Sequence, residues 1–350
     1  MIKLFLTLYC LFGFCVFSSS SKWESTELIW NLGTAQISDI GIPEDPTILF
    51  QGNEDKKCLF YSNLQLASQQ KSVLLIYLSP HNFKYVYKKF LSKMNSPYAL
   101  IITNGDRSFP SECGITIDQL EQMLAKKNLL HIFSQNLDHI HEKLTALPIG
   151  LDFHSLAYKK ENIYWGPKMS PREQEKILMD IVSHAPALEF RKKRIFVDFQ
   201  HSDTLHHGDL ERFKKLGENR STIFKKLEST KQIDFFSKPV ERKILWETKA
   251  SYVFSVSPHG NGLDCHRTWE DLALGCIVIV KSSPLDCLYE GLPVVIVRSW
   301  DEITDNNLYI WYERYKNIDT NPMLKEKLTS KFWLNLIEGK IKKCLESYYY

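Results

Sequence analysis

Short apolar runs alternate with longer mixed segments from residue 73 onward. A fully apolar run of a few residues is typical of a strand buried on both faces, whereas longer mixed segments are typical of helices. Strands are therefore predicted at residues 73–78, 99–103, 129–134, 194–199, 252–256, 276–280 and 292–297. Helices are predicted at residues 83–94, 116–128, 171–184, 263–275, 306–316 and 324–345. This alternation predicts parallel strand pairing and an α/β fold.

The alternation is interrupted once, by a polar and mostly helical segment at residues 155–193. We interpret it as the connection between two halves, at residues 22–185 and 190–320, followed by a C-terminal helix at residues 321–350. The chain of 350 residues is 44% hydrophobic, which suffices for two cores. The sequence thus predicts two Rossmann-like domains that face a cleft, with ligands outside the carboxyl ends of the strands.

The N-terminus carries an apolar run, LFLTLYCLFGFCVF, between Lys3 and a serine cluster at residues 18–21. A positive start, a short apolar run and small residues are typical of a secretory signal peptide. We predict a signal peptide at residues 1–20 and an exported protein. A signal anchor is the alternative, in which the same run associates the chain with a membrane. Six cysteines remain without the leader, and buried free thiols are favoured over disulfides.

The charge of the chain indicates which classes of ligand it can bind. The chain has 44 Lys+Arg against 41 Asp+Glu, and a net formal charge of +3. So small an excess supplies no strong field for a nucleic acid, which excludes a polybasic nucleic-acid-binding protein. Residues 190–249 nevertheless hold 15 Lys+Arg against 9 Asp+Glu. This local excess indicates a small ligand that carries phosphate.

One segment combines a strand, a glycine-containing loop and a helix, at residues 255–270 (SVSPHGNGLDCHRTWE). Gly260 and Gly262 allow the backbone to approach an anion, and the N–H groups at the start of a helix attract it. The same spacing also fits a tight turn followed by a helix that Asp264 caps. The loop by itself leaves both interpretations open.

The helix after this loop carries charged side chains on one face. Arg267 and Glu270 are three residues apart, and His266 and Glu270 are four apart. An arginine here can clamp a diphosphate with its planar fork, and a glutamate can accept hydrogen bonds from ribose hydroxyls. The alternative is an ordinary Arg267–Glu270 surface pair, which contributes little to stability.

The segment SPHGNGLDCHRTWEDLALGCIVIV resembles the C-terminal motif of the exostosin-like glycosyltransferases, glycosyltransferase family 47 and its relatives. In that family a strand, a loop, an Arg-x-x-Glu helix and a Gly-Cys-apolar strand follow one another in this order. The specific similarity covers about residues 250–305. Val278 stands where the family often has proline. The N-terminal half is too dissimilar to carry over an acceptor site.

The resemblance implies a GT-B fold, with a donor-nucleotide domain at residues 190–320 and an acceptor domain at residues 22–185. It implies transfer of a sugar from a nucleotide-sugar donor to a hydroxyl of a glycan or glycoconjugate. GT-B enzymes generally work without a bound metal, so neither a metal nor another cofactor is expected. The donor-binding residues expected from the loop and the motif are Ser257, His259, Gly260, Asn261, Gly262, His266, Arg267 and Glu270.

Such a transfer needs a group that takes the proton of the acceptor hydroxyl. Acidic and histidine candidates follow the N-terminal strands, namely His81, Asp106, Asp152 and His154. Asp106 is preferred, because Gly105 permits a sharp turn that exposes it, and His81 is the second choice. A non-catalytic exported protein that binds carbohydrate or nucleotide is the alternative function, since such a receptor needs a cleft but no base.

The sequence predicts no metal site. The cysteines form no CxxC pair. A loop rich in His and Asp follows the strand at residues 194–199, and it includes His201, Asp203, His206, His207 and Asp209. Its spacing matches no metal-binding pattern, so we interpret it as the mouth of the cleft or as an exposed loop.

Overall fold

The structure is a computed structural model that describes residues 25–34, 38, 73–158, 165–201 and 219–349. The predicted signal peptide lies outside the described residues, as does most of the His/Asp-rich loop after residue 201. Within the described part of the chain, no helix is both long and apolar enough to cross a membrane. The five cysteines in that part are all free thiols, namely Cys113, Cys265, Cys276, Cys287 and Cys344.

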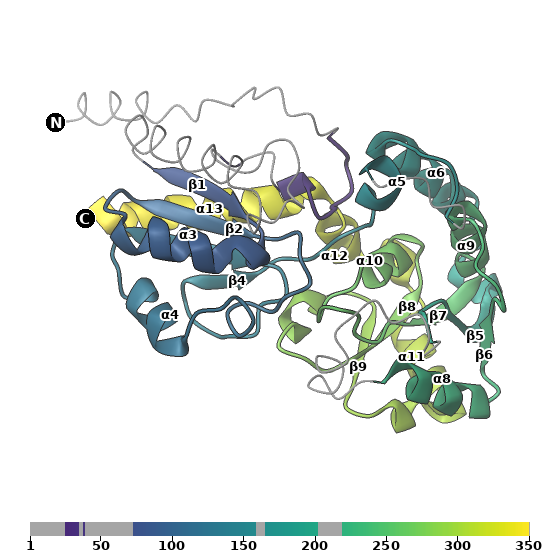
Figure 1. Ribbon diagram of the computed structural model, residues 1–350. Coiled ribbons are helices and arrows are strands. Elements are labelled where there is room, and N and C mark those ends of the chain that lie inside the picture. Colours follow the sequence, from purple (N-terminus) through teal and green to yellow (C-terminus); the bar gives the residue numbers. More distant parts are fainter. Residues whose placement is uncertain (1–24, 35–37, 39–72, 159–164, 202–218, 350) are drawn as a thin grey trace.

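The N-terminal half contains a four-stranded parallel sheet in the order β1-β2-β3-β4 (Figure 1). Its strands are β1 (Leu74–Leu78), β2 (Tyr98–Ile102), β3 (Leu129–Ser134) and β4 (Leu144–Ala146). Helices α3 (Phe83–Lys89) and α4 (Ile117–Leu124) connect them. All residues of β2 and β3 are buried, as expected for apolar strands in a sheet covered on both faces.

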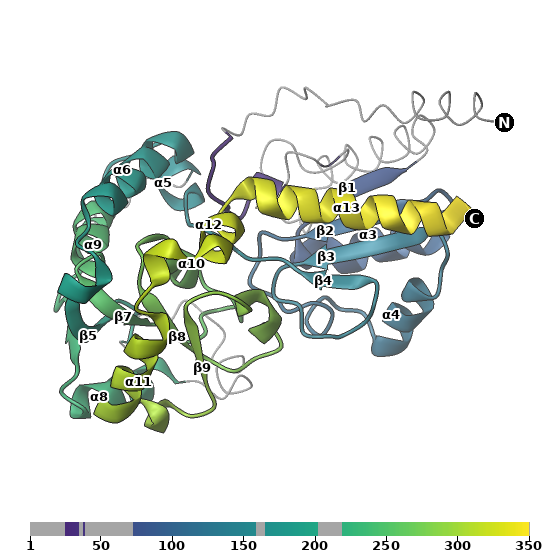
Figure 2. The same cartoon turned by 180° about the vertical axis from the view of Figure 1, so that it is seen from behind.

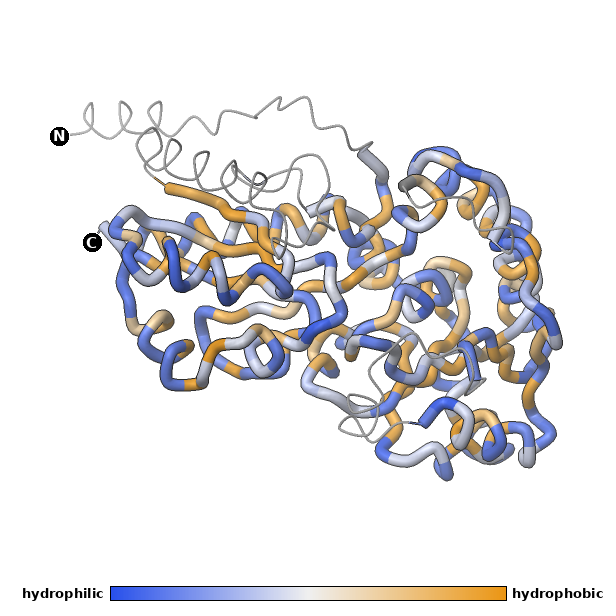
Figure 3. The backbone as a smooth tube through the Cα atoms, viewed as in Figure 1, coloured by the Kyte–Doolittle hydropathy of each residue, from blue (hydrophilic) through white to orange (hydrophobic). Residues whose placement is uncertain are grey.

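The C-terminal half contains a five-stranded parallel sheet in the order β6-β5-β7-β8-β9. Its strands are β5 (Lys192–Val197), β6 (Ile233–Phe235), β7 (Tyr252–Val256), β8 (Ile277–Lys281) and β9 (Val294–Val297). The helices of this half are α8 (Arg220–Ser229), α9 (Arg242–Lys249), α10 (His266–Ala273) and α11 (Asp305–Tyr315). Apolar residues are concentrated along the strands of both sheets (Figure 3).

Two connections join the halves. Helices α5 (His154–Tyr158) and α6 (Pro171–His184) lead from the first sheet to the second. At the other end, α12 (Pro322–Lys327) and the long α13 (Ser330–Tyr349) return to the N-terminal half, where α13 packs against β3 (Figure 2). Two parallel sheets with helices, joined in this way, confirm the predicted α/β fold of the GT-B type.

Some predicted elements differ from the structure for tertiary reasons. The predicted helix at residues 263–275 begins only at His266, because Asp264 is drawn into contacts with the N-terminal half. Strand β6 is not among the predicted strands, and it is only three residues long at the edge of its sheet. The predicted helix at residues 324–345 divides into α12 and α13 at Leu328, whose carbonyl accepts a hydrogen bond from the N–H of Ile29.

Candidate active-site cleft

A cavity of about 320 Å³ lies between the two halves. Part of its wall comes from loops that follow the carboxyl ends of strands, as expected for ligand sites of parallel sheets, and part from helices α9 and α10. Asp106 follows β2, Asp198 follows β5, and the glycine-containing loop follows β7. The lining residues are Asp106, Ile149, Asp152, Trp165, Asp198, Val240, Arg242, Leu245, Gly260, Asn261, Gly262, Asp264, Cys265, His266, Arg267 and Glu270.

The glycine-containing loop approaches the N-terminal half too closely for a side chain at Gly262. A Cβ on that residue would lie 2.7 Å from Asn136 Nδ2 and 2.9 Å from the backbone oxygen of Asp106. Contacts this short require atoms to shift, so glycine permits the approach. The loop is turned on itself by a 3.0 Å hydrogen bond from the N–H of Gly260 to the carbonyl of Gly262. Asp106, the preferred catalytic base, is therefore brought beside the loop.

Asp264 connects the loop to the N-terminal half. Its Oδ2 accepts a 2.7 Å hydrogen bond from the N–H of Ile149, and its own N–H donates to Asn136 Oδ1 at 2.8 Å. The same carboxylate accepts from Trp269 Nε1 at 3.0 Å. Burial raises the pKa of Asp264 to about 6. The alternative interpretation, in which Asp264 caps the following helix, is wrong, because Cys265 is the N-cap residue and its side chain makes no capping hydrogen bond.

The guanidinium of Arg267 is bound through Nε and Nη1, whereas Nη2 can donate to a ligand. Its Nε lies 2.8 Å from Asp198 Oδ1, and its Nη1 donates to Ser257 Oγ at 3.3 Å. Among the described residues, Nη2 has no hydrogen-bond partner. Because Arg267 lines the cavity, this nitrogen is a donor for a bound anion. Arg267 and Glu270 do not pair with each other, so the alternative of a surface Arg–Glu pair does not apply.

A buried cluster of charges lies behind Arg267. Lys249 is fully buried, with its Nζ 2.6 Å from Asp198 Oδ2 and in contact with the carboxylate of Asp271. Ser255 donates a hydrogen bond to Asp271. Burial disfavours the charge of Lys249, but the two carboxylates outweigh it and raise the pKa of this ammonium. The cluster therefore holds Asp198, and through it the guanidinium of Arg267, in one position.

Glu270 is 8% exposed and lines the same cavity. Its Oε1 accepts a hydrogen bond from the N–H of Asp152 at 3.4 Å, and its Oε2 accepts one from Trp246 Nε1 at 3.5 Å. Both bonds are long, so they hold the carboxylate only weakly. Burial raises the pKa of Glu270, although Arg242 acts in the opposite direction.

Asp152 and Arg242 form a second buried pair at this cleft. Arg242 Nη2 lies 3.1 Å from Asp152 Oδ2, and Arg242 Nη1 donates to Gln174 Oε1 at 2.9 Å. Burial opposes ionisation of Asp152, but His154, His266 and Arg242 outweigh it and hold its pKa well below the ordinary value. Arg242 is thus engaged by a carboxylate of the N-terminal half.

The predicted site residues divide into two groups. Those that line the cavity are Asp106, Gly260, Asn261, Gly262, His266, Arg267 and Glu270. Ser257 and His259 are buried beneath the loop and support it: Ser257 Oγ lies 2.8 Å from Thr268 Oγ1, and His259 Nδ1 donates to the carbonyl of Leu263 at 2.8 Å. The side chains of these two residues are therefore not placed to touch a donor.

The second choice for the base, His81, does not line the cavity. It lies in a short 3-10 helix at Pro80–Asn82, where its Cδ2 is 3.2 Å from the position a Cβ would take on Gly105. Sequence reasoning missed Asp198, although an acidic residue near the end of the predicted strand at residues 194–199 was a usable signal. Lys249 was also missed, and nothing in its local sequence distinguishes it from the exposed lysines nearby.

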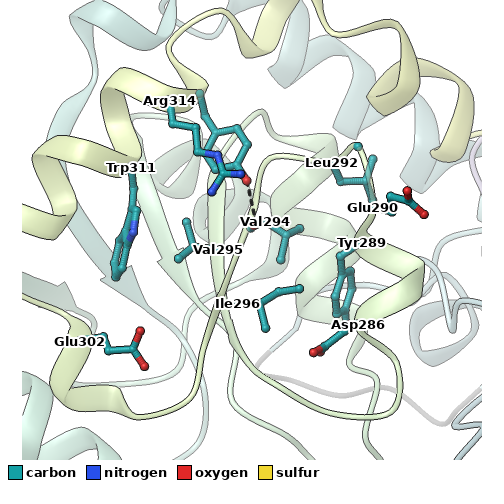
Figure 4. A pocket seen from close by; sticks show the side chains of 12 residues that line it. Asp286, Tyr289, Glu290, Leu292, Val294, Val295, Ile296, Glu302, Trp311 and Arg314 are labelled. Atoms are coloured by element: carbon teal, nitrogen blue, oxygen red, sulfur yellow. Dashed lines mark hydrogen bonds between the residues drawn. The ribbon is translucent and has the colours of Figure 1, made fainter.

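A second cavity of about 430 Å³ lies elsewhere, between the edge strand β9 and helix α11 (Figure 4). Trp311 and Arg314 of α11 stand on one side, and the side chains of β9 form the floor. Tyr315 donates a 3.0 Å hydrogen bond to the carbonyl of Val294. None of the predicted site residues lines this cavity.

No family model and no curated protein matches this sequence. Solved structures do show a likeness. An α,α-trehalose-phosphate synthase (UDP-forming) from Burkholderia vietnamiensis is 14% identical, with a TM-score of 0.39 over 81% of this chain and 78% of that one. The catalytic domain of starch synthase IV from Arabidopsis thaliana, bound to ADP and acarbose, is 12% identical, with a TM-score of 0.34 over 87% and 81%.

At such identities and TM-scores, the likeness assigns neither an activity nor residue roles to this chain. The class that the two parallel sheets define is α/β of the GT-B type. Its function is argued below from the cleft itself.

Proposed function

We propose that this protein is a glycosyltransferase of the exostosin-like group, which moves a sugar from a nucleotide-sugar donor to a hydroxyl of a glycan or glycoconjugate. One observation carries the proposal. Arg267, whose Nη2 has no hydrogen-bond partner among the described residues, lines a cavity that the glycine-containing loop and Glu270 also line. This is a set of groups suited to a diphosphate and a ribose in one place.

The donor would bind mainly to the C-terminal half. Arg267 takes the diphosphate, with Asp198 fixing its Nε so that the free end of the fork faces the cavity. The backbone N–H groups at the start of α10 add positive potential on the same side. Glu270 takes the ribose hydroxyls in exchange for its long hydrogen bonds to Asp152 and Trp246.

The transfer then needs a proton acceptor and a stabilised leaving group. Asp106 lines the cavity from the N-terminal half and takes the proton of the acceptor hydroxyl as its oxygen bonds to the anomeric carbon. The bond from that carbon to the diphosphate breaks, and Arg267 and the end of α10 stabilise the departing nucleoside diphosphate. These positive groups allow the step to proceed without a catalytic metal.

The domains and the compartment belong to the same proposal. Residues 22–185 supply the acceptor side and residues 190–320 the donor side. Residues 1–20 act as a signal peptide that directs the enzyme to export.

The test is a panel of uridine, guanosine and adenosine diphosphate sugars, with donor affinity and nucleotide release both measured. Arg267→Ala should reduce turnover by about 100-fold or more, the effect of losing a donor that stabilises developing charge. Glu270→Ala should weaken donor binding. Arg194→Ala is the matched control, because Arg194 pairs with Asp234 on the surface and does not line the cavity.

Folded Arg267→Ala and Glu270→Ala proteins with the turnover and donor affinity of the wild type would refute the proposal. Donor binding without release, whatever acceptor is supplied, would favour the non-catalytic carbohydrate- or nucleotide-binding protein instead.

A further inference from the structure

Two histidines and a carboxylate converge where the two halves meet. Asp152 and His154 lie at the start of the connection, and His266 is the first residue of α10 in the C-terminal half. One nitrogen or oxygen atom from each side chain lies within 4.8 Å of the others. Asp152 and His266 also line the cleft cavity, so the cluster opens toward it.

The tautomer of His266 is set by the backbone. Its Nδ1 lies 2.7 Å from the carbonyl oxygen of Gly150, which can only accept, so Nδ1 carries the proton. The lone pair is therefore on Nε2. A neutral imidazole whose other nitrogen donates to a carbonyl is the form in which histidine binds metals.

Asp152 and His154 are also held by neighbouring groups. Oδ2 of Asp152 is occupied by Arg242 Nη2 at 3.1 Å, and Oδ1 accepts a 3.0 Å hydrogen bond from the N–H of Ser155. His154 Nδ1 lies 2.7 Å from Oδ1, so the imidazole and the carboxylate form a close pair. The rings of His154 and His266 are 5.4 Å apart between centroids. Two imidazoles and one carboxylate whose nitrogen and oxygen atoms lie this close together form a set of side chains that divalent transition metals use as ligands.

We propose that Asp152, His154 and His266 bind a divalent transition-metal ion such as Zn²⁺, through one carboxylate oxygen and two imidazole nitrogens. Two nitrogen ligands favour Zn²⁺ or Co²⁺ over Mg²⁺ and Ca²⁺, which prefer oxygen. Arg242 then serves as the outer partner that orients the carboxylate. The sequence predicted no metal site, because His266 lies far along the chain from Asp152 and His154.

The ion would fix the two halves relative to each other, because its ligands come from the connection and from the C-terminal half. It takes no part in the sugar transfer proposed above, and it does not depend on that proposal. A metal-binding measurement without any nucleotide sugar therefore tests the site on its own. A result that refutes the metal site does not refute the proposed glycosyl transfer, and the reverse also holds.

The test uses the full chain, stripped with a chelator and titrated with Co²⁺ while its visible d–d absorption is followed. One Co²⁺ per chain should bind, and Zn²⁺ should displace it. His154→Ala and His266→Ala should each weaken binding more than the roughly 10- to 100-fold typical of an outer-shell change. His184→Ala is the matched control, because His184 is exposed on α6 and, among the described residues, its polar contacts are to its own helix.

A second control is the double variant His206→Ala/His207→Ala, in the loop outside the described residues. If this variant lost the Co²⁺ signal while His154→Ala kept it, the assignment would be wrong. Wild-type protein that bound no Co²⁺ would also overturn it. If the single variants do not fold, the wild-type protein provides the test. Its melting temperature should rise with Zn²⁺ concentration, because an ion that binds only the folded state stabilises it. A melting temperature that does not rise would refute the site.

Discussion

Replacing Lys249 by methionine is the most direct test of the charge cluster behind the cleft. The change keeps the length of the side chain but removes its charge. Lys249 is fully buried, and its ammonium contacts Asp198 at 2.6 Å and also the carboxylate of Asp271. Two buried carboxylates would then share a single counter-charge, that of Arg267, which reaches only Asp198.

The expected cost follows from that imbalance. Removing one partner of a buried ion pair destabilises a protein by about 3–5 kcal/mol, since it leaves an uncompensated buried charge. Asp271 is the group left in this state, because its remaining partner is the hydroxyl of Ser255. We expect Lys249→Met to lower the free energy of unfolding by about that amount.

Urea denaturation followed by tryptophan fluorescence measures the effect. Lys243→Met is the matched control on the same helix, because Lys243 is exposed and its pair with Glu247 spans 3.7 Å at the surface. Such a pair contributes about 0.3–0.5 kcal/mol. If Lys249→Met unfolded within about 1 kcal/mol of the wild type, the reasoning that the cluster depends on a charged lysine would be refuted.

Two further predictions concern the N-terminal half. Gly150→Ala should lower the free energy of unfolding by about 2 kcal/mol or more. The reason is that φ of Gly150 is +66° and the new Cβ would lie 2.5 Å from the carbonyl oxygen of Ile29. Equal urea midpoints for the variant and the wild type would contradict this prediction. Burial lowers the pKa of His131 from 6.5 to about 4, so the unfolded chain binds more protons in this range, and stability should fall as pH drops from about 6.5 to 4. The loss is on the order of 3 kcal/mol, and His131→Gln should show a correspondingly weaker pH dependence of unfolding; identical pH profiles would count against the assignment.

The local pattern of apolar and polar residues predicted much of the fold. The apolar runs at residues 73–78, 99–103 and 129–134 correspond to strands β1, β2 and β3, because burial on both faces of a parallel sheet demands continuous apolar sequence. The loop around Gly260 and the helix with Arg267 were likewise visible, since both are defined by residues within two turns of each other.

The partners of the charged residues were decided only by the tertiary structure. Asp264 looked like a helix cap, yet its carboxylate binds the N–H of Ile149, 115 residues earlier in the chain. A surface pair of Arg267 and Glu270 was the alternative to donor binding, yet Arg267 binds Asp198. The spacing of residues in sequence fixes which side chains share a helix face, but not what that face meets.

The same reason explains the two clusters that sequence reasoning did not find. Lys249 has the local sequence of a surface lysine, and only the docking of α9 on its sheet buries it between two carboxylates. His154 and His266 meet only because the two halves close on one cleft. The sequence by itself determined most of the strands, the loop and the residue types at the cleft, but not the three-residue strands β4 and β6. The packing of the halves determined which of those groups touch, because contacts across a domain interface leave no periodic signal along the chain.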